Sequence, residues 1–70
     1  SQEINATCIG STQQILVEGI KNDQPFGRTR TGKLVHVDAP ARIGSLIDVR
    51  IEHAGAFSLR GSFADALVMA

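Results

Sequence analysis

The side chains best suited to bind a charged ligand are concentrated in one stretch of the chain. Residues 26–37, FGRTRTGKLVHV, hold Arg28, Arg30, Lys33 and His36 and no acidic residue, although the formal net charge of the chain is zero. Outside this stretch four Lys and Arg stand against seven Asp and Glu, so the charge is segregated. Cations neutralise phosphates, and the planar guanidinium group makes bidentate hydrogen bonds to phosphate oxygens and base edges. The stretch therefore points to a nucleic-acid strand as the ligand.

Alternation along the expected strands adds further residues to this surface. Successive side chains of a strand point to opposite faces, so residues two apart share a face. Cations on neighbouring strands, with an aromatic ring at their edge, would suit phosphates and stacked bases. Any single arginine could equally be solvated or paired across strands, as Arg50 lies between Asp48 and Glu52. The residues expected to face outward are Phe26, Arg28, Arg30, His36, Arg50 and Arg60.

Catalytic and metal-binding chemistry has little support in the residue pattern. His36 and Asp38 are two residues apart, and His53 follows an acidic residue, but neither set includes a nucleophile in a recognisable context. Two histidines on separate strands, without a third ligand nearby, do not predict a metal site. The single cysteine, Cys8, excludes an internal disulfide and is expected to be a small buried hydrophobe. We predict no catalytic residue and no metal ligand.

The elements that must position these residues are short strands. Thr31-Gly32 predicts a hairpin, because Gly32 can supply the positive φ that such a turn needs. An open sheet of this size would leave two exposed edges. We therefore expect an all-β fold, a small five-stranded antiparallel OB-like β-barrel. Alternation and turn residues predict strands over 13–19, 26–30, 33–37, 45–55 and 57–63.

The chain is long enough for one domain at most. We expect a flexible leading segment or linker over 1–12, the β-barrel over 13–63 and a C-terminal tail over 64–70. The apolar runs are too short for a membrane span, and a lone thiol fits a reducing cytoplasm. Gly61 is expected on the inner face, where a barrel strand bends. The other side chains expected to face the core include Ile15, Val17, Val35, Val37, Ile47, Val49, Ile51, His53, Phe57, Leu59 and Phe63.

Three stretches, ILVEG, FGRTRTGKLVHV and IGSLIDVRIEHAGAFSLRG, resemble a TRAM domain. In particular they resemble the C-terminal TRAM domain of bacterial tRNA methylthiotransferases, the radical-SAM enzymes of the MiaB type. That family shows a VLVEG strand, a GRT followed by a hairpin, an IG…VDV.I strand and a closing SLRG. The resemblance covers about residues 10–63. It implies an OB-like barrel that binds tRNA and helps to dock the anticodon stem-loop near a catalytic domain.

The resemblance assigns roles to residues of the GRT and SLRG motifs. Arg28 and Arg60 are the main expected RNA contacts, whereas Gly27 and Gly61 are expected to serve backbone geometry. Phe26 or Phe57 would be available for stacking on bases. The predicted RNA-binding residues are Arg28, Arg30, Lys33, His36, Arg50, Arg60, Phe26 and Ser58.

The resemblance also implies cofactors that this chain has no residues to hold. The full enzymes carry two 4Fe-4S clusters and use S-adenosylmethionine, but the chain has no CxxxCxxC triplet, and Cys8 alone cannot replace it. We therefore expect no cofactor here, and expect as partners tRNA and the catalytic domain of the same polypeptide, with no membrane. Two alternatives remain open. One is a structural docking domain with little RNA contact, favoured by outward-facing Leu16 and Leu34, and the other is a standalone TRAM RNA-binding protein.

Overall fold

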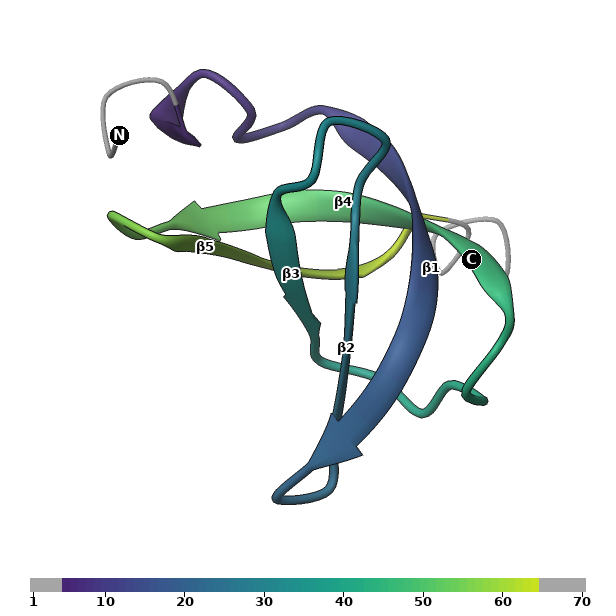
Figure 1. Ribbon diagram of the computed structural model, residues 1–70. Helices are drawn as coiled ribbons and strands as arrows, with labels where there is room; N and C mark the ends of the chain where they lie inside the picture. Colours follow the sequence, from purple (N-terminus) through teal and green to yellow (C-terminus); the bar gives the residue numbers. More distant parts are fainter. Residues whose placement is uncertain (1–4, 65–70) are drawn as a thin grey trace.

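The computed structural model describes residues 5–64, which form a closed β-barrel (Figure 1). Around the barrel the strands follow the order β1-β2-β3-β5-β4. This confirms the all-β, OB-like fold expected from the sequence. No helix within the described residues is long and apolar enough to cross a membrane. The strands are β1 (Thr12–Lys21), β2 (Gln24–Arg28), β3 (Leu34–Val37), β4 (Leu46–Ala54) and β5 (Ser58–Phe63).

The expectation that all strand pairs are antiparallel is corrected at one place. β3 and β5 pair in parallel, whereas the other four neighbouring pairs are antiparallel. Strand directions cannot alternate all the way around a ring with an odd number of members, so a closed barrel of five strands must contain a parallel pair. The β4–β5 hairpin crosses β2 and β3 steeply in Figure 1, and β5 closes the barrel between β3 and β4.

The core of the barrel is purely aliphatic. Inward positions alternate with outward ones along β1, β3 and β4, as the sequence pattern predicts. Cys8 is half-buried and packs against this core, in line with its expected role as a small hydrophobe. The hydrophobic side chains exposed by 1% or less are Ile15, Val17, Val35, Val37, Val49, Ile51 and Leu59.

Two register shifts change which side chains face outward. In β1 the shift lies between Val17 and Gly19, and in β4 it lies between Ile51 and His53. A bulge inserts one unpaired residue, so the residue after it changes face. His53 was expected on the core face, and this is wrong: it is exposed and lies opposite Arg60.

The end of the β4–β5 hairpin also differs from the prediction. Phe57 was expected to share the inner face with Leu59, but β5 begins only at Ser58. Phe57 instead lies in the preceding turn and is 93% exposed, so its core assignment is wrong. Leu59 is buried as expected, and Phe63 is half-buried.

The β2 strand lies between two turns. Asn22 and Asp23 both have positive φ, 52° and 65°, as in the two-residue type I′ hairpin turn between β1 and β2. The β2–β3 loop has Gly32 at φ 86°, which confirms the predicted role of this glycine. The buried Thr29 braces that loop: its N–H donates to the Lys33 carbonyl at 3.0 Å, and its Oγ1 accepts from the Lys33 N–H at 3.2 Å.

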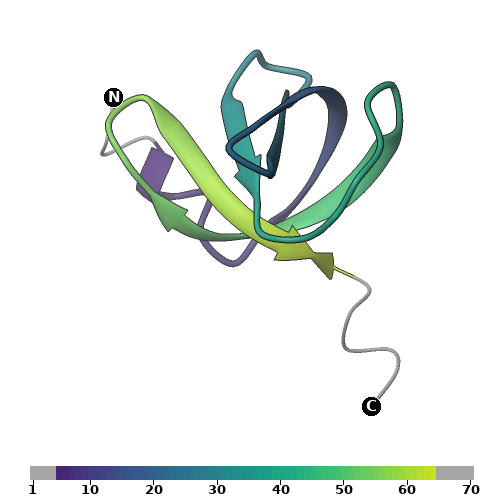
Figure 2. The ribbon, with the colours of Figure 1, turned by 90° about the horizontal axis from the view of Figure 1, so that it is seen from below.

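Residues 5–11, expected within the flexible leading segment, are hydrogen-bonded to the barrel. The N–H of Gly10 donates to the Ile51 carbonyl at 2.8 Å, and the N–H of Ile51 donates to the Ser11 carbonyl at 2.9 Å. Asn5 is only 5% exposed and links two loops. Its Nδ2 donates to the Gly55 carbonyl at 3.0 Å, and its Oδ1 accepts from Lys33 Nζ at 2.8 Å. The N-terminal turn (purple) lies beside the β4–β5 turn in Figures 1 and 2.

Replacing Asn5 by alanine is expected to destabilise the protein by about 2 kcal/mol, because it leaves the Gly55 carbonyl and the Lys33 ammonium without their partner. The check is the free energy of unfolding in urea. Gln24→Ala is the control, since it removes an exposed side-chain hydrogen bond to Asp38. An equal effect of both substitutions would show that Asn5 does not hold the two loops.

Candidate nucleic-acid interface

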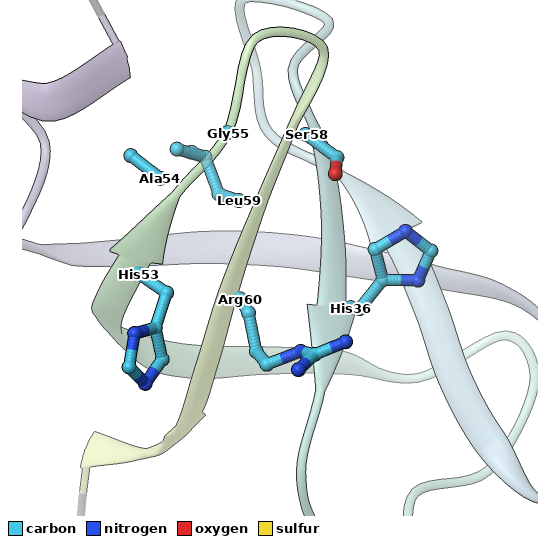
Figure 3. A pocket seen from close by; sticks show the side chains of 7 residues that line it. All are labelled: His36, His53, Ala54, Gly55, Ser58, Leu59 and Arg60. Atoms are coloured by element: carbon cyan, nitrogen blue, oxygen red, sulfur yellow. The ribbon is translucent and has the colours of Figure 1, made fainter. Parts of the chain in front are cut away.

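Four outward-facing side chains form one row across four neighbouring strands. The register places Phe26 opposite His36, His36 opposite Arg60, and Arg60 opposite His53. Residues directly opposite on adjacent strands have Cβ atoms within about 5.5 Å. The cross-strand row, as we call these four residues, therefore runs over β2, β3, β5 and β4. Figure 3 shows the Arg60 side chain between the two imidazole rings.

A shallow hollow of about 270 Å³ opens beside this row, between β3 and the β4–β5 hairpin (Figure 3). It offers hydrogen-bond donors of three kinds, guanidinium, imidazole and hydroxyl. This mixture suits a ligand that carries both phosphate oxygens and polar base edges. The hollow is lined by His36, His53, Ala54, Gly55, Ser58, Leu59 and Arg60.

Arg60 is paired with an acidic residue, but only loosely. Its Nε lies 4.0 Å from Asp38 Oδ1, and both side chains are about half exposed. The same Asp38 oxygen accepts a hydrogen bond from Gln24 Nε2 at 2.6 Å. Exposed ion pairs contribute about 0–1 kcal/mol, so a phosphate can compete for the guanidinium group.

Arg28 lies on β2, one outward position from Phe26, opposite Leu16 and Leu34. Its Nε is 3.7 Å from Glu18 Oε1, and its Nη1 donates to the Gly32 carbonyl at 3.2 Å. A second hollow of about 290 Å³ lies here. Its lining residues are Gln14, Leu16, Glu18, Arg28, Thr29, Arg30 and Leu46. Arg28 is thus exposed but held at the end of β2 away from Arg60.

The remaining predicted contacts are spread over the barrel. Arg30 is exposed in the β2–β3 loop, beyond the end of β2. Lys33 is half-buried, with its ammonium group on Asn5. Arg50 lies opposite Thr12 and Ser62, outside the cross-strand row. Ser58 lines the first hollow.

The ring of Phe26 is engaged within the barrel. Phe26 lies opposite Gly19 on β1. A Cβ added at Gly19 would come within 2.6 Å of the Phe26 ring, so the ring covers this glycine. The far end of the Phe26 ring is therefore in contact with β1, which makes it a less accessible platform for a base than its position in the sequence suggests.

Two features of this surface are absent from the prediction based on strand alternation. His53 reaches the row only because of the bulge in β4, and no residue type in the sequence marks that bulge. Glu18, from β1, lies beside Arg28, and Asp38, just after the basic stretch, lies beside Arg60. A charge count along the chain does not detect such pairing, because the strand order creates it.

The described residues do not fit a metal or an iron–sulfur cluster. Within residues 5–64 no group of three or more His, Cys, Asp or Glu is placed to hold a metal ion. Clusters of this kind are held by several cysteine thiolates, and Cys8 packs against the core. We therefore assign no reaction step to a cofactor in this chain.

Comparison with known proteins identifies the barrel. Residues 6–64 match the model of the TRAM domain. The chain is also similar to proteins named tRNA-2-methylthio-N(6)-dimethylallyladenosine synthase. The protein of Acetivibrio thermocellus is 47% identical over 66 residues, which are 89% of this chain and 14% of that protein. That of Bacteroides thetaiotaomicron is 42% identical over 65 residues, 87% of this chain and 14% of that protein. The chain spans only this small part of its relatives, and it belongs to the TRAM domain family.

Proposed function

We propose that this chain is the RNA-binding module of a tRNA-modifying methylthiotransferase and positions the anticodon stem-loop for the catalytic domain of the same polypeptide. The names of the similar proteins support this, since they describe synthases of a 2-methylthio-adenosine in tRNA. The iron–sulfur clusters and S-adenosylmethionine of such an enzyme would belong to its catalytic part. Its location would be the cytoplasm, with tRNA as the main partner.

The observation that carries the proposal is the cross-strand row. It combines a guanidinium group and two imidazoles with a hollow that can receive polar groups. The guanidinium group can hold a phosphate, the imidazoles can hydrogen-bond to RNA, and RNA-binding sheets use such exposed faces. Arg60 is the cation of the row, and Arg28, Arg30 and Arg50 would add positive charge elsewhere on the barrel. Lys33, tied to Asn5, would act on RNA through the loop it holds.

Replacing Arg60 by alanine is expected to weaken binding of an anticodon stem-loop. One lost phosphate contact lowers the slope of log K against log salt by about 0.7 for a single strand, which is about fivefold in affinity at about 0.1 M salt. The measurement is a binding titration at two salt concentrations. Arg42→Ala is the matched control, because Arg42 is exposed in the β3–β4 connection, outside the row. No binding at low salt, or equal losses for both variants, would refute the proposal.

A docking role is the second candidate, and one observation favours it. Leu16 and Leu46 lie opposite each other on β1 and β4 and are 44% and 63% exposed, and Ile43 in the preceding loop is 61% exposed. In this role the barrel packs this apolar face on the catalytic domain and touches little RNA. Amide NMR shifts on adding tRNA separate the two functions. Shifts at the cross-strand row support RNA binding, and the absence of shifts supports docking. A standalone RNA-binding TRAM protein would give the same shifts.

A further inference from the structure

We propose that the β4–β5 turn and the hollow beside it bind a single unpaired nucleotide, with its base stacked on Phe57 and its phosphate held by Arg60. This inference rests on the proposed RNA-binding function and specifies its ligand. It takes up the expectation that Phe57 is available for stacking, which the turn permits because it places Phe57 outside the core.

Phe57 is the most exposed large hydrophobic side chain among the described residues. It is 93% exposed, whereas the other large hydrophobic residues at the surface are 44–63% exposed. This exposure leaves both faces of the ring open to a planar partner. Phe26, the other aromatic candidate, is half-buried, with the far end of its ring against Gly19. An aromatic ring held in water has no role in packing the barrel, and stacking on a base would remove its apolar surface from water.

The turn that carries Phe57 is fixed from both sides. The N–H of Gly55 donates to the Ser58 carbonyl at 2.9 Å, which closes the turn. The Gly55 carbonyl accepts from the buried amide of Asn5 at 3.0 Å, which ties the turn to the N-terminal segment. A backbone already held in place loses less conformational entropy when a ligand binds. The structure therefore presents Phe57 on a preorganised support.

The hollow supplies the polar half of the site. Gly55 and Ser58, which flank the turn residues, both line it, and so does Arg60. In Figure 3 the imidazoles of His36 and His53 lie on either side of the Arg60 side chain. A guanidinium group at this position can hold a phosphate while the base of the same nucleotide reaches the turn. The guanidinium group of Arg60 is paired with Asp38. The phosphate of the nucleotide would take the place of the Asp38 carboxylate.

The geometry favours an unpaired nucleotide over a duplex. Bases inside an RNA duplex are stacked on one another, whereas unpaired bases in loops and single strands can be splayed onto aromatic side chains. A duplex could contact Arg60 through its phosphates, but the bases along its length are stacked on one another and offer no free face to the ring. A binding surface for RNA helices would therefore depend on Arg60 and not on Phe57.

The test compares a short oligoadenylate with a long RNA duplex, in which very few bases lie at an exposed end. Phe57→Ala is expected to weaken oligoadenylate binding about tenfold, in the range measured for loss of base–aromatic stacking, and to leave duplex binding unchanged. Ile20→Ala is the control, since Ile20 is also exposed and lies on β1 opposite Pro25, away from the turn and from both hollows. Phe57→Trp should retain binding, because an indole stacks as well as a phenyl ring.

The tryptophan variant also reports stacking directly. The chain has no Trp, so the introduced indole is its only tryptophan fluorophore. Its emission should be quenched by oligoadenylate and not by the duplex, and Ile20→Trp should respond to neither. If oligoadenylate binds but Phe57→Ala binds it equally well, the nucleotide site is refuted while RNA binding stands. If neither RNA binds the unaltered chain while an anticodon stem-loop does, the nucleotide site is refuted; if the stem-loop also fails to bind, the proposed function fails with it.

Discussion

Replacing Gly61 by alanine is expected to lower the melting temperature by more than about 12 °C. Gly61 lies on the inner face of β5, opposite Ile51 on β4 and Val37 on β3. An added Cβ would overlap the carbonyl oxygen of Arg50 and come within 2.8 Å of Val49 Cγ1. Backbone cannot yield as a flexible side chain does, so we expect about 3 kcal/mol, the upper end for overpacking, and about 4–8 °C are lost per kcal/mol in a domain of this size.

Closure of the barrel makes this substitution more harmful than it would be on an edge strand. β5 is hydrogen-bonded to β4 on one side and β3 on the other, and the N–H of Asp38 donates to the Gly61 carbonyl at 2.8 Å. A shift of β5 away from Arg50 therefore disturbs both neighbours. Gly55→Ala is the matched control, because a Cβ there meets only the Ser58 carbonyl oxygen at 3.6 Å, an ordinary contact. Thermal unfolding by circular dichroism should separate the two variants clearly, and similar melting temperatures would contradict the role of Gly61.

The sequence contains enough information to predict the inner face of the barrel. Ile15 and Val17 alternate with outward-facing residues along β1, and Val35 and Val37 do so along β3, and all four are buried. This succeeds because a strand with one face in the core must keep a period of two. The glycine at position 32 was predictable for a similar local reason, since a positive φ in a tight loop favours glycine.

The outer surface was less predictable, because it depends on which strands become neighbours. His36 and Arg60 lie opposite each other only because β5 inserts beside β3 in a parallel pairing. Alternation within each strand says which residues point outward, but not which row they join. The bulge before His53 has no sequence signal comparable to a glycine in a turn. The same limit applies to Phe57. Because β5 begins at Ser58 and not at residue 57, the Phe57 side chain lies in the turn and in solvent and not in the core.

The arrangement of the strands also determines which basic side chains are paired with acidic residues. The stretch from Phe26 to Val37 has no acidic residue, but the fold places Glu18 beside Arg28 and Asp38 beside Arg60. The site is therefore more mixed in charge than the stretch alone indicates. This mixture gives a means of testing whether RNA binds at the row, because the two members of one ion pair should affect RNA binding in opposite directions.

Reversing the charge at Arg60 is expected to weaken binding of an anticodon stem-loop about 25-fold at about 0.1 M salt. Arg60→Glu removes one phosphate contact and adds one repulsion, which together change the salt slope by about 1.4. Asp38→Asn should have the opposite sign and strengthen binding. It removes the carboxylate that lies 4.0 Å from the guanidinium group, while the amide oxygen can still accept the hydrogen bond from Gln24.

The opposite signs distinguish a binding site from a structural ion pair. If the pair only stabilised the fold, both substitutions would lower stability slightly and neither would change RNA affinity, because exposed pairs contribute about 0–1 kcal/mol. If RNA phosphates replace Asp38 on Arg60, the same two substitutions must move affinity in opposite directions at nearly unchanged melting temperature. Titrations at two salt concentrations, with circular dichroism melts of each variant, measure both quantities. If Asp38→Asn weakened RNA binding as Arg60→Glu does, the RNA would have to bind elsewhere on the barrel.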